Sequence, residues 1–292
     1  MTDKAYRTKM LGVVTLYNPD PEQAAANIRR YVPDVDKLVV WDNSPLEKGL
    51  QPAILRLLGE QAGKVVWQGN GQNRCIAKAI NYAWQLAQEQ GFDLLLLMDQ
   101  DSSWADFPAY RTEIESIFCE GKLCAFTPYV PGNDTWAVTE KVQQRRLFIN
   151  SGTVIPVYIL NALNGADEAF PLDALDYDLA LRILKRGYST VCLTSCILHH
   201  TLGSPKRSPL LKLYTPDYGE ARTYSIVYSH LLNYRKNRKW MTANERRREL
   251  KEFLFWKFVR IVLAEQQKWS RMKMYFKGVR DGLRFDLSQT KP

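Results

Sequence analysis

Three apolar runs in the first hundred residues each end at a cluster of polar residues. The runs are Met10–Leu16, Lys37–Trp41 and Leu94–Met98, and they precede Tyr17-Asn18-Pro19, Asp42-Asn43-Ser44-Pro45 and Asp99-Gln100-Asp101. Apolar runs of this length without alternation predict strands buried on both faces of a sheet. We therefore expect three core strands whose carboxyl ends carry polar loops.

Helical patterns lie between these runs. Glu22–Tyr31 is one, and Asn73–Gln90 is the clearer, with Asn73 as the expected N-cap and Gly91 as the stop. Strands that alternate with helices predict a mostly parallel sheet flanked by helices. Ligands of such sheets bind at the carboxyl ends of the strands, where the polar loops lie.

The second half of the chain is less regular. Phe148–Ile159 is apolar enough for another buried segment, Ala174–Lys185 predicts a helix that ends before Gly187, and Tyr188–Leu198 predicts a strand. From Thr242 the chain becomes helical, basic and aromatic-rich, and Thr242 has the spacing of a capping box with Glu245. No internal repeat interrupts this order.

Charge separates the end of the chain from the rest. Residues 231–292 carry 17 Lys and Arg against 6 Asp and Glu, whereas residues 1–230 carry 23 against 25. We therefore expect an α/β domain over residues 1–230. A basic helical C-terminal region, 231–292, follows it.

Composition indicates the compartment. The first ten residues mix acid and base and lack the apolar segment of a secretory signal, and no run is apolar for the eighteen residues that a membrane span needs. Five cysteines, an odd number, favour reduced thiols over a disulfide framework. A cytoplasmic protein is expected.

Asp99 and Asp101 directly follow the most apolar strand, Leu94–Met98. Two carboxylates separated by one residue at a rigid strand end can hold a hard divalent cation, Mg²⁺ or Mn²⁺, that also binds the phosphates of a nucleotide. The alternative is that both acids only form a turn, in which Asp is common. Spacing alone does not separate the two.

Several segments in the same order resemble the inverting glycosyltransferases of family 2, and most closely their bacterial rhamnosyltransferase-like branch. The likeness extends from about Val13 to Gly203. Its segments are Val13-Val14-Thr15-Leu16-Tyr17-Asn18, Val39-Val40-Trp41-Asp42-Asn43-Ser44, Asn73 with Ala77, Ala79 and Asn81, Met98-Asp99-Gln100-Asp101-Ser102, Asn150-Ser151-Gly152-Thr153, Leu175 to Arg182 and His200-Thr201-Leu202-Gly203. The resemblance implies a GT-A fold, which is Rossmann-like, and transfer of a sugar from a nucleotide diphosphate. It also implies a nucleotide-binding half of about 1–103 and an acceptor half of about 104–230.

The resemblance also implies roles for individual residues. The nucleotide-sugar site is expected to comprise Thr15, Tyr17, Asn18, Asp42, Asn43, Asn73, Lys78, Asp99 and Gln100. The acceptor side is expected to comprise Asn150, Ser151, Gly152, Asp173 and Arg182, and the metal ligands Asp99, Asp101 and His200. The chain departs from the family at Cys75, where glycine is usual, and at Leu175-Asp176, where a pair of carboxylates is common.

Asp176 is expected to act as the general base. An inverting transfer needs one carboxylate that takes the proton of the acceptor hydroxyl. On a helix Asp173 and Asp176 share a face and Asp178 points elsewhere. The alternative is that these acids only favour the N-terminal end of a helix dipole.

Other interpretations remain. Cys192, Cys196, His199 and His200 have the residue types of a zinc site, but their spacing is not that of two separated ligand pairs. A sugar-phosphate nucleotidyltransferase would need a glycine-rich basic loop after the first strand, and Val13–Pro21 has neither feature. A catalytically inactive relative that binds nucleotide sugars is the third possibility.

The C-terminal region carries no zinc-finger or RNA-binding signature, so we expect no nucleic acid partner. Its apolar stripe is explained by packing on the domain, and its Lys, Arg and Trp also suit peripheral contact with the anionic inner face of the cell membrane. The resemblance implies a hexosyltransferase of bacterial surface polysaccharide synthesis. L-rhamnose from dTDP-rhamnose is the expected sugar, UDP-hexose or UDP-galactofuranose the alternative, and a glycan or lipid-linked glycan the acceptor.

Overall fold

The computed structural model describes residues 8–134, 136–200, 206–207, 214–215 and 218–292. The chain forms two compact units, Met1–Ala166 with Arg186–Thr201 and Asp167–Lys185 with Leu202–Pro292. The expected boundary at residue 230 falls inside helix α7 (Glu220–Asn237). Each unit is described below by itself.

Unit 1 contains the predicted parallel sheet. Strands β1 (Met10–Leu16), β2 (Lys37–Asp42), β3 (Val65–Gly69) and β4 (Leu94–Asp99) pair in parallel in the order β3-β2-β1-β4. The three apolar runs of the sequence are therefore adjacent strands at the centre of the sheet. Their connections contain helices α1 (Pro21–Arg29), α2 (Leu50–Leu58) and α3 (Cys75–Glu89).

Beyond β4 the sheet becomes mixed, in the order β4-β8-β6-β9-β5, with β7 paired to β9. These strands are β5 (Ser102–Trp104), β6 (Cys124–Tyr129), β7 (Val142–Arg145), β8 (Val154–Pro156) and β9 (Ser189–His200). Helices α4 (Phe107–Cys119) and α5 (Val157–Leu163) belong to the same unit. The mostly parallel sheet flanked by helices is confirmed.

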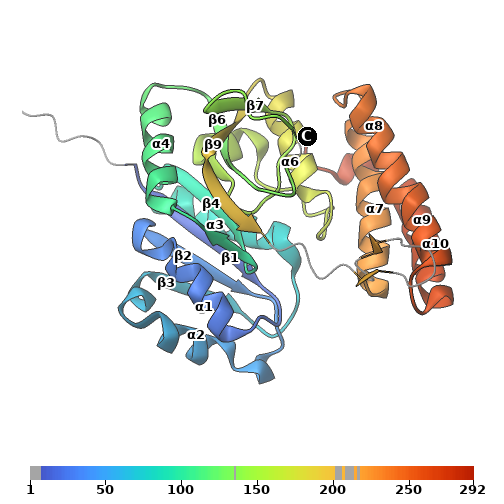
Figure 1. Ribbon diagram of the computed structural model, residues 1–292, viewed down its shortest axis with the longest axis horizontal. Coiled ribbons are helices and arrows are strands. Elements are labelled where there is room, and N and C mark those ends of the chain that lie inside the picture. Colours follow the sequence, from blue (N-terminus) through green and yellow to red (C-terminus); the bar gives the residue numbers. More distant parts are fainter. Residues whose placement is uncertain (1–7, 135, 201–205, 208–213, 216–217) are drawn as a thin grey trace, which may run out of the picture. The chain divides into compact units, whose positions relative to one another are not determined.

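Helices cover both faces of this sheet (Figure 1). Buried side chains of α1, α2 and α4 form one core cluster with alternate strand residues such as Val14, Leu38 and Leu96. Helices α3 and α5 bury other side chains and are joined by a 2.7 Å hydrogen bond from Trp84 Nε1 to Asn161 Oδ1. Strand residues that alternate between two apolar layers explain why the interior of each run is apolar and why its polar residues, such as Lys37 and Thr15, lie near its ends.

One sequence expectation about local structure needs correction. Helix α3 has Arg74 as its N-cap residue, and the Asn73 side chain instead accepts a 3.0 Å hydrogen bond from the Cys75 amide. The cause is the positive φ of Cys75, +66°, which is not helical. The segment 148–159 is buried over most of its length, as expected, and Gly152 at φ +78° turns the chain within it before β8 and α5.

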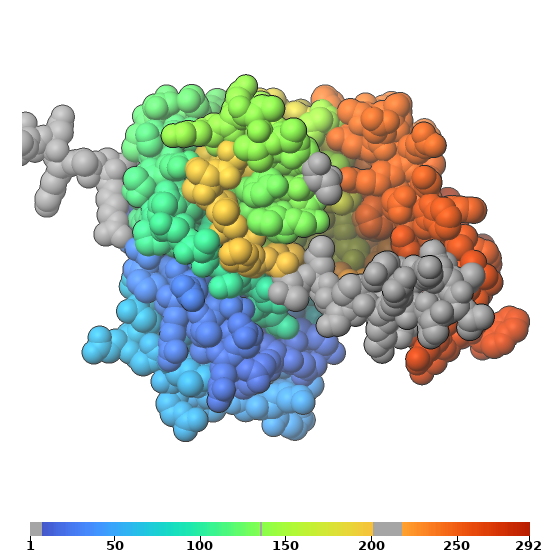
Figure 2. All heavy atoms as spheres, in the orientation of Figure 1, coloured from blue at the N-terminus to red at the C-terminus, as the bar shows by residue number. Residues whose placement is uncertain are grey.

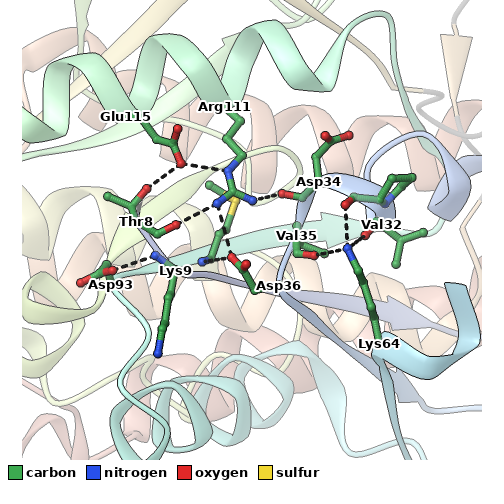
Figure 3. A network of polar contacts seen from close by, with 12 residues as sticks. Thr8, Lys9, Val32, Asp34, Val35, Asp36, Lys64, Asp93, Arg111 and Glu115 are labelled. Carbon is green, nitrogen blue, oxygen red and sulfur yellow. Dashed lines mark hydrogen bonds and ion pairs between the residues drawn. The ribbon is translucent and has the colours of Figure 1, made fainter. Parts of the chain in front are cut away.

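A polar network secures the beginnings of the central strands (Figure 3). The buried Arg111 of α4 donates to the Thr8 carbonyl at 2.8 Å and pairs with Asp36 at 3.3 Å and with Glu115 at 3.0 Å. Thr8 and Asp36 lie just before β1 and β2. The network therefore stabilises the amino edge of the sheet and leaves the carboxyl edge for the polar loops.

Unit 2 is mainly helical. It comprises α6 (Leu175–Lys185), α7 (Glu220–Asn237), α8 (Ala243–Leu250), a π-helical turn (Lys251–Phe255), α9 (Trp256–Leu263) and α10 (Lys268–Arg284), together with the short pair β10 (Lys206–Arg207) and β11 (Tyr214–Thr215). The capping box of Thr242 and Glu245 is present at α8. No helix in the described part of the chain combines the length and apolar character needed to cross a membrane.

Glycines let α10 pack tightly against α7. A Cβ atom at Gly278 would lie 3.0 Å from the Tyr224 carbonyl oxygen, and one at Gly282 would lie 3.2 Å from the Tyr228 carbonyl oxygen. Arg235 of α7 also donates a 2.6 Å hydrogen bond to the Gly282 carbonyl. One side of α10 is thus fixed to α7, and its opposite side is left at the surface.

Candidate functional site

The carboxyl ends of β2, β1 and β4 lie side by side in unit 1. Thr15 is in register with Trp41 on one side and with Asp99 on the other. The sheet therefore brings Asp42 and Asp99, which are 57 positions apart in sequence, to the same edge. This confirms the expectation that the polar loops converge there.

Asp99, Asp101 and His200 form a group that suits a divalent cation. Each offers one ligand atom, and these atoms all lie within 4.8 Å of one another. His200 Nδ1 is 3.4 Å from Asp101 Oδ1, and the His200 side chain is 10% exposed against 45% for that of Asp101. Two carboxylates and one imidazole are ligands that Mn²⁺ accepts, while two carboxylates alone also suit Mg²⁺.

Strand pairing brings His200 to the carboxylates. Strand β5 starts at Ser102, directly after the acidic pair, and runs antiparallel to the end of β9 so that Ser102 faces His200. His199 is paired with Ser103 and is exposed. The preference for His200 over His199 is thereby given a geometric reason, because adjacent residues of a strand point to opposite faces.

A chain of hydroxyl groups connects the two sides of this group. The Asp99 amide donates to Ser151 Oγ at 3.2 Å, Ser151 Oγ donates to Ser102 Oγ at 2.7 Å, and Ser102 Oγ lies 2.7 Å from His200 Nδ1. Ser102 and Ser151 are fully buried. The hydroxyls therefore fix the orientation of the imidazole relative to the backbone that carries Asp99.

Ser102 was not among the site residues expected from the sequence, although it belongs to the Asp-Gln-Asp-Ser segment. Ser151 was expected on the acceptor side, but its hydroxyl is occupied in the hydroxyl chain. A serine beside a strand end carries no distinctive sequence signal. Only the pairing of β5 with β9, across 98 positions, reveals the contact.

The cysteine alternative is not favoured. The thiols of Cys192 and Cys196 are buried, and burial raises the pKa of both, that of Cys196 to about 11. A raised pKa disfavours the thiolate that zinc requires. The metal-ligand group found within the described residues contains neither cysteine.

Residues expected to contact the nucleotide lie around the same edge, but several have structural partners. The Gln100 side chain pairs with the backbone of Tyr17, accepting from its amide at 2.7 Å and donating to its carbonyl at 3.3 Å. The buried Asn43 accepts from Trp41 Nε1 at 3.1 Å and from the Arg74 amide at 2.9 Å. These two side chains therefore position the loops.

The other expected nucleotide residues are more open. Thr15 and Asp42 are half-buried, and Tyr17, Asn18, Asn73 and Lys78 are exposed. The Asp42 carboxylate accepts from the Ser44 amide at 2.8 Å. The Arg74 guanidinium lies over the Trp41 ring, 4.3 Å from its centroid. Arg74 thus adds a cation next to the strand ends that sequence reasoning did not include.

The segment 150–153 is hydrogen-bonded to the last residues of β4. The Gly152 amide donates to the Leu97 carbonyl at 2.8 Å, and Tyr110 Oη donates to the Gly152 carbonyl at 2.9 Å. A Cβ atom on Gly152 would lie 2.6 Å from Pro128 Cγ. Glycine is therefore required at position 152. Asn150 is buried, and its Oδ1 atom has no hydrogen-bond partner among the described residues.

Asp176 and the acids near it belong to unit 2. Asp176 lies in the first turn of α6 and is half-buried, whereas Asp173 precedes the helix and pairs with Arg222 at 3.0 Å. The expectation that Asp173 and Asp176 share a helix face is therefore wrong, because Ala174 at φ +57° breaks the helix between them. Asp176 remains the position that resembles the base.

Arg182, expected on the acceptor side, is fully buried. Its guanidinium lies 3.6 Å from the Asp178 carboxylate, which also pairs with Lys236 at 2.7 Å. A buried charge is stable only with such partners, and burial raises the pKa of Asp178. Arg182 is thus part of the core of unit 2, and we do not include it among acceptor contacts.

The closing His200-Thr201-Leu202-Gly203 motif is described only at His200. Its last three residues lie outside the part of the chain that the structure describes. The metal-ligand group does not depend on them.

No family model matches the sequence, and no curated protein matches it either. The fold does have similar solved structures. One is the mannosyltransferase PcManGT from Pyrobaculum calidifontis, in complex with GDP-Man and Mn²⁺, at a TM-score of 0.58 and 14% identity over 97% of this chain and 78% of that one. Another is GalNAc-T7 with UDP, GalNAc and Mn²⁺, at a TM-score of 0.52 and 10% identity over 92% of this chain and 57% of that one.

At these identities the likeness concerns the fold. The chain has a GT-A-type glycosyltransferase fold, in which a mostly parallel sheet flanked by helices is accompanied by a helical C-terminal region. The group formed by Asp99, Asp101 and His200 lies at the carboxyl edge that this fold class uses for ligands.

Proposed function

We propose that this protein is an inverting glycosyltransferase that uses a divalent cation and a nucleotide diphosphate sugar. The observation that supports the proposal most is the convergence of Asp99, Asp101 and His200 at the carboxyl edge of a GT-A-type sheet. An ordered resemblance to family 2 glycosyltransferases at the same residues agrees with it. Activity and substrate are inferences from this site.

The residues fit a divalent cation by their chemistry. Asp99 and Asp101 supply hard carboxylate oxygens, and His200 supplies an imidazole whose orientation is fixed by Ser102. When bound, the cation provides a Lewis acid that stabilises the negative charge of the departing diphosphate. The protein's own contribution is to hold Asp99 at the end of β4, Asp101 in the turn between β4 and β5, and His200 at the end of β9, at one edge of a rigid sheet.

The sugar donor is expected to lie along the ends of β1, β2 and β4. Asp42 is half-buried at the end of β2, where its carboxylate is available to a ribose hydroxyl or to a polar group of the base. Lys78 is exposed and is available to a phosphate. We propose dTDP-rhamnose as the sugar donor, on the basis of the family resemblance. UDP-hexose or UDP-galactofuranose is the alternative, and the two similar structures contain GDP-Man and UDP with GalNAc.

Asp176 is proposed as the general base. Its half-buried carboxylate stands in the first turn of α6, whereas the neighbouring Asp178 is buried and paired with Lys236 and Arg182. Asp176 is therefore the carboxylate of α6 that can meet an acceptor hydroxyl. The acceptor is proposed to be a glycan or a lipid-linked glycan made on the cytoplasmic side of the membrane during surface polysaccharide synthesis.

The test is transfer by an Asp176→Asn variant, with Asp178→Asn as a comparison. For Asp176→Asn we expect unchanged binding of the nucleotide sugar but at least a hundredfold lower transfer, because proton removal contributes about 10²- to 10⁴-fold. Asp178→Asn should mainly lower the midpoint of thermal unfolding. Normal turnover by Asp176→Asn would exclude it as the base, and a folded wild-type protein that binds nucleotide sugars without transfer would be an inactive relative.

A further inference from the structure

The outer side of helix α10 carries large apolar side chains in solvent. Trp269 is 85% exposed, Phe276 57% and Leu283 54%. These residues are seven positions apart, or two helical turns, so they form one line along the helix over about 21 Å. Exposed apolar side chains are ordinary when scattered, but a line of three large ones indicates a surface that something covers.

Basic residues run beside this line. Lys273, Lys277, Arg280 and Arg284 are exposed and lie on the adjoining strip of the same helix. Asp281 pairs with Lys277 at 2.7 Å and with Arg280 at 2.9 Å. It is the acid of α10, so the strip keeps an excess of positive charge. We call Trp269, Phe276 and Leu283, with Lys273 and Arg284, the outer face of α10.

The inner side of α10 is packed against α7, and this packing holds the outer face in its position. Arg271, Tyr275, Gly278 and Gly282 are buried, and the two glycines pack against the backbone of α7. Helices α7 to α10, coloured orange to red, lie beside one another within this unit (Figure 1), and their atoms form one continuous mass in the space-filling view (Figure 2). The outer face is therefore held outward by tight packing within unit 2.

We propose that the outer face of α10 binds the surface of an anionic lipid bilayer. An interfacial helix has an apolar line with aromatic residues that enters the boundary of headgroups and acyl chains, and basic residues beside it that meet lipid phosphates. Trp269, Phe276 and Leu283 match the first requirement. Lys273 and Arg284 match the second.

Two other occupants fit less well. A second copy of the chain joined through the same face would bring Lys273 and Arg284 of both copies together, and like charges oppose such an interface. A nucleic acid would use the cations, but the apolar line would have no partner on a phosphate backbone. Only a bilayer satisfies both the apolar and the basic residues of this face.

The proposal is tested by co-sedimentation of the full chain with vesicles. Vesicles of phosphatidylcholine alone are compared with vesicles that contain 30% phosphatidylglycerol, a composition chosen for negative charge. The chain is expected to bind the anionic vesicles and not the neutral ones, and binding should weaken as salt rises because exposed charges are screened. Equal binding to both vesicles, or to neither, would overturn the proposal.

Variants localise the surface. Trp269→Ser with Phe276→Ser should weaken binding at least tenfold, since each large side chain loses apolar contact, and Lys273→Glu should weaken it at least fivefold. Trp240→Ser, a 45% exposed tryptophan of the same unit, and Lys48→Glu in unit 1 are the matched controls and should bind as the wild type does. Equal loss in the controls would overturn the assignment to α10.

The same samples distinguish the other occupants. Light scattering that shows a dimer abolished by Trp269→Ser, without vesicle binding, would assign the face to a second copy and overturn the proposal. Retention on single-stranded DNA that is lost in Lys273→Glu, again without vesicle binding, would also overturn it. Thermal unfolding of each variant verifies folding, and none of these measurements depends on transferase activity.

Discussion

Ser102 Oγ lies 2.7 Å from His200 Nδ1, across the antiparallel pair of β5 and β9. The same hydroxyl accepts a hydrogen bond from Ser151, whose oxygen accepts one from the Asp99 amide. The imidazole is therefore oriented by the strand end that carries the two aspartates. Such support of a metal ligand is a common determinant of metal affinity.

Ser102→Ala should weaken Mn²⁺ binding about 10- to 100-fold, because the His200 ring loses the hydroxyl that orients it. Calorimetric titration of Mn²⁺ into the protein measures this directly. The matched control is Ser103→Ala. Ser103 is the next residue of β5 and is paired with His199. Equal Mn²⁺ affinity in both variants would show that the hydroxyl chain has no part in holding the imidazole.

Cys75→Gly should stabilise the protein. Cys75 has φ +66°, a left-handed conformation that costs a residue with a side chain roughly 1–2 kcal/mol. Part of this gain is offset by the greater freedom of glycine in the unfolded chain, so the free energy of unfolding should rise by about 0.5–1 kcal/mol. Denaturant unfolding measures it.

Cys119→Gly is the control for this change. Cys119 is the last residue of α4 and has an ordinary helical conformation, so glycine there should lower the free energy of unfolding by up to about 1 kcal/mol. The sequence resemblance noted glycine as usual at position 75, and the positive φ supplies the physical reason. A loss of stability in Cys75→Gly equal to that in Cys119→Gly would contradict this explanation.

Gly152→Ala should be strongly destabilising, by about 3 kcal/mol or more. The new methyl group would lie 2.6 Å from Pro128 Cγ and 2.8 Å from Leu198 Cδ2, in addition to the strain of φ +78°. Gly132→Ala measures the backbone strain without the steric clash. Gly132 has φ +85°, but a Cβ atom there would have no other atom within 4 Å. Its cost should be about 1–2 kcal/mol, and equal unfolding midpoints for the two variants would contradict the steric account.

The fold could be predicted from sequence to the extent that it depends on local pattern. The runs at Met10, Lys37 and Leu94 are strands whose interior residues are apolar because both sheet faces are covered. Their polar residues, Lys37 and Thr15, lie at or next to the strand ends. The turn at Gly152 could not be predicted from the sequence, because it is held by hydrogen bonds to Tyr110 and Leu97, which belong to distant elements. Apolar composition indicates burial but not the direction of the chain.

The candidate site divides in the same way. Asp99 and Asp101 were found because they directly follow a strand, and His200 was found through a family resemblance. Ser102 was missed because its role depends on the pairing of β5 with β9. Arg182 was assigned to the acceptor side from its motif, but its burial with Asp178 is set by the partner Lys236 on α7, which no local pattern reveals.

Asp99, Asp101 and His200 are proposed to hold a divalent cation for a nucleotide diphosphate sugar. The most direct test of this proposal is calorimetric titration of dTDP- and UDP-sugars into the wild type and Asp101→Ala, with Mn²⁺ and then with a chelator. One sugar donor is expected to bind the wild type only when metal is present, and Asp101→Ala is expected to bind it at least tenfold more weakly. Binding that is unchanged by chelator and by Asp101→Ala, or no binding of any sugar donor to the folded protein, would contradict the proposal.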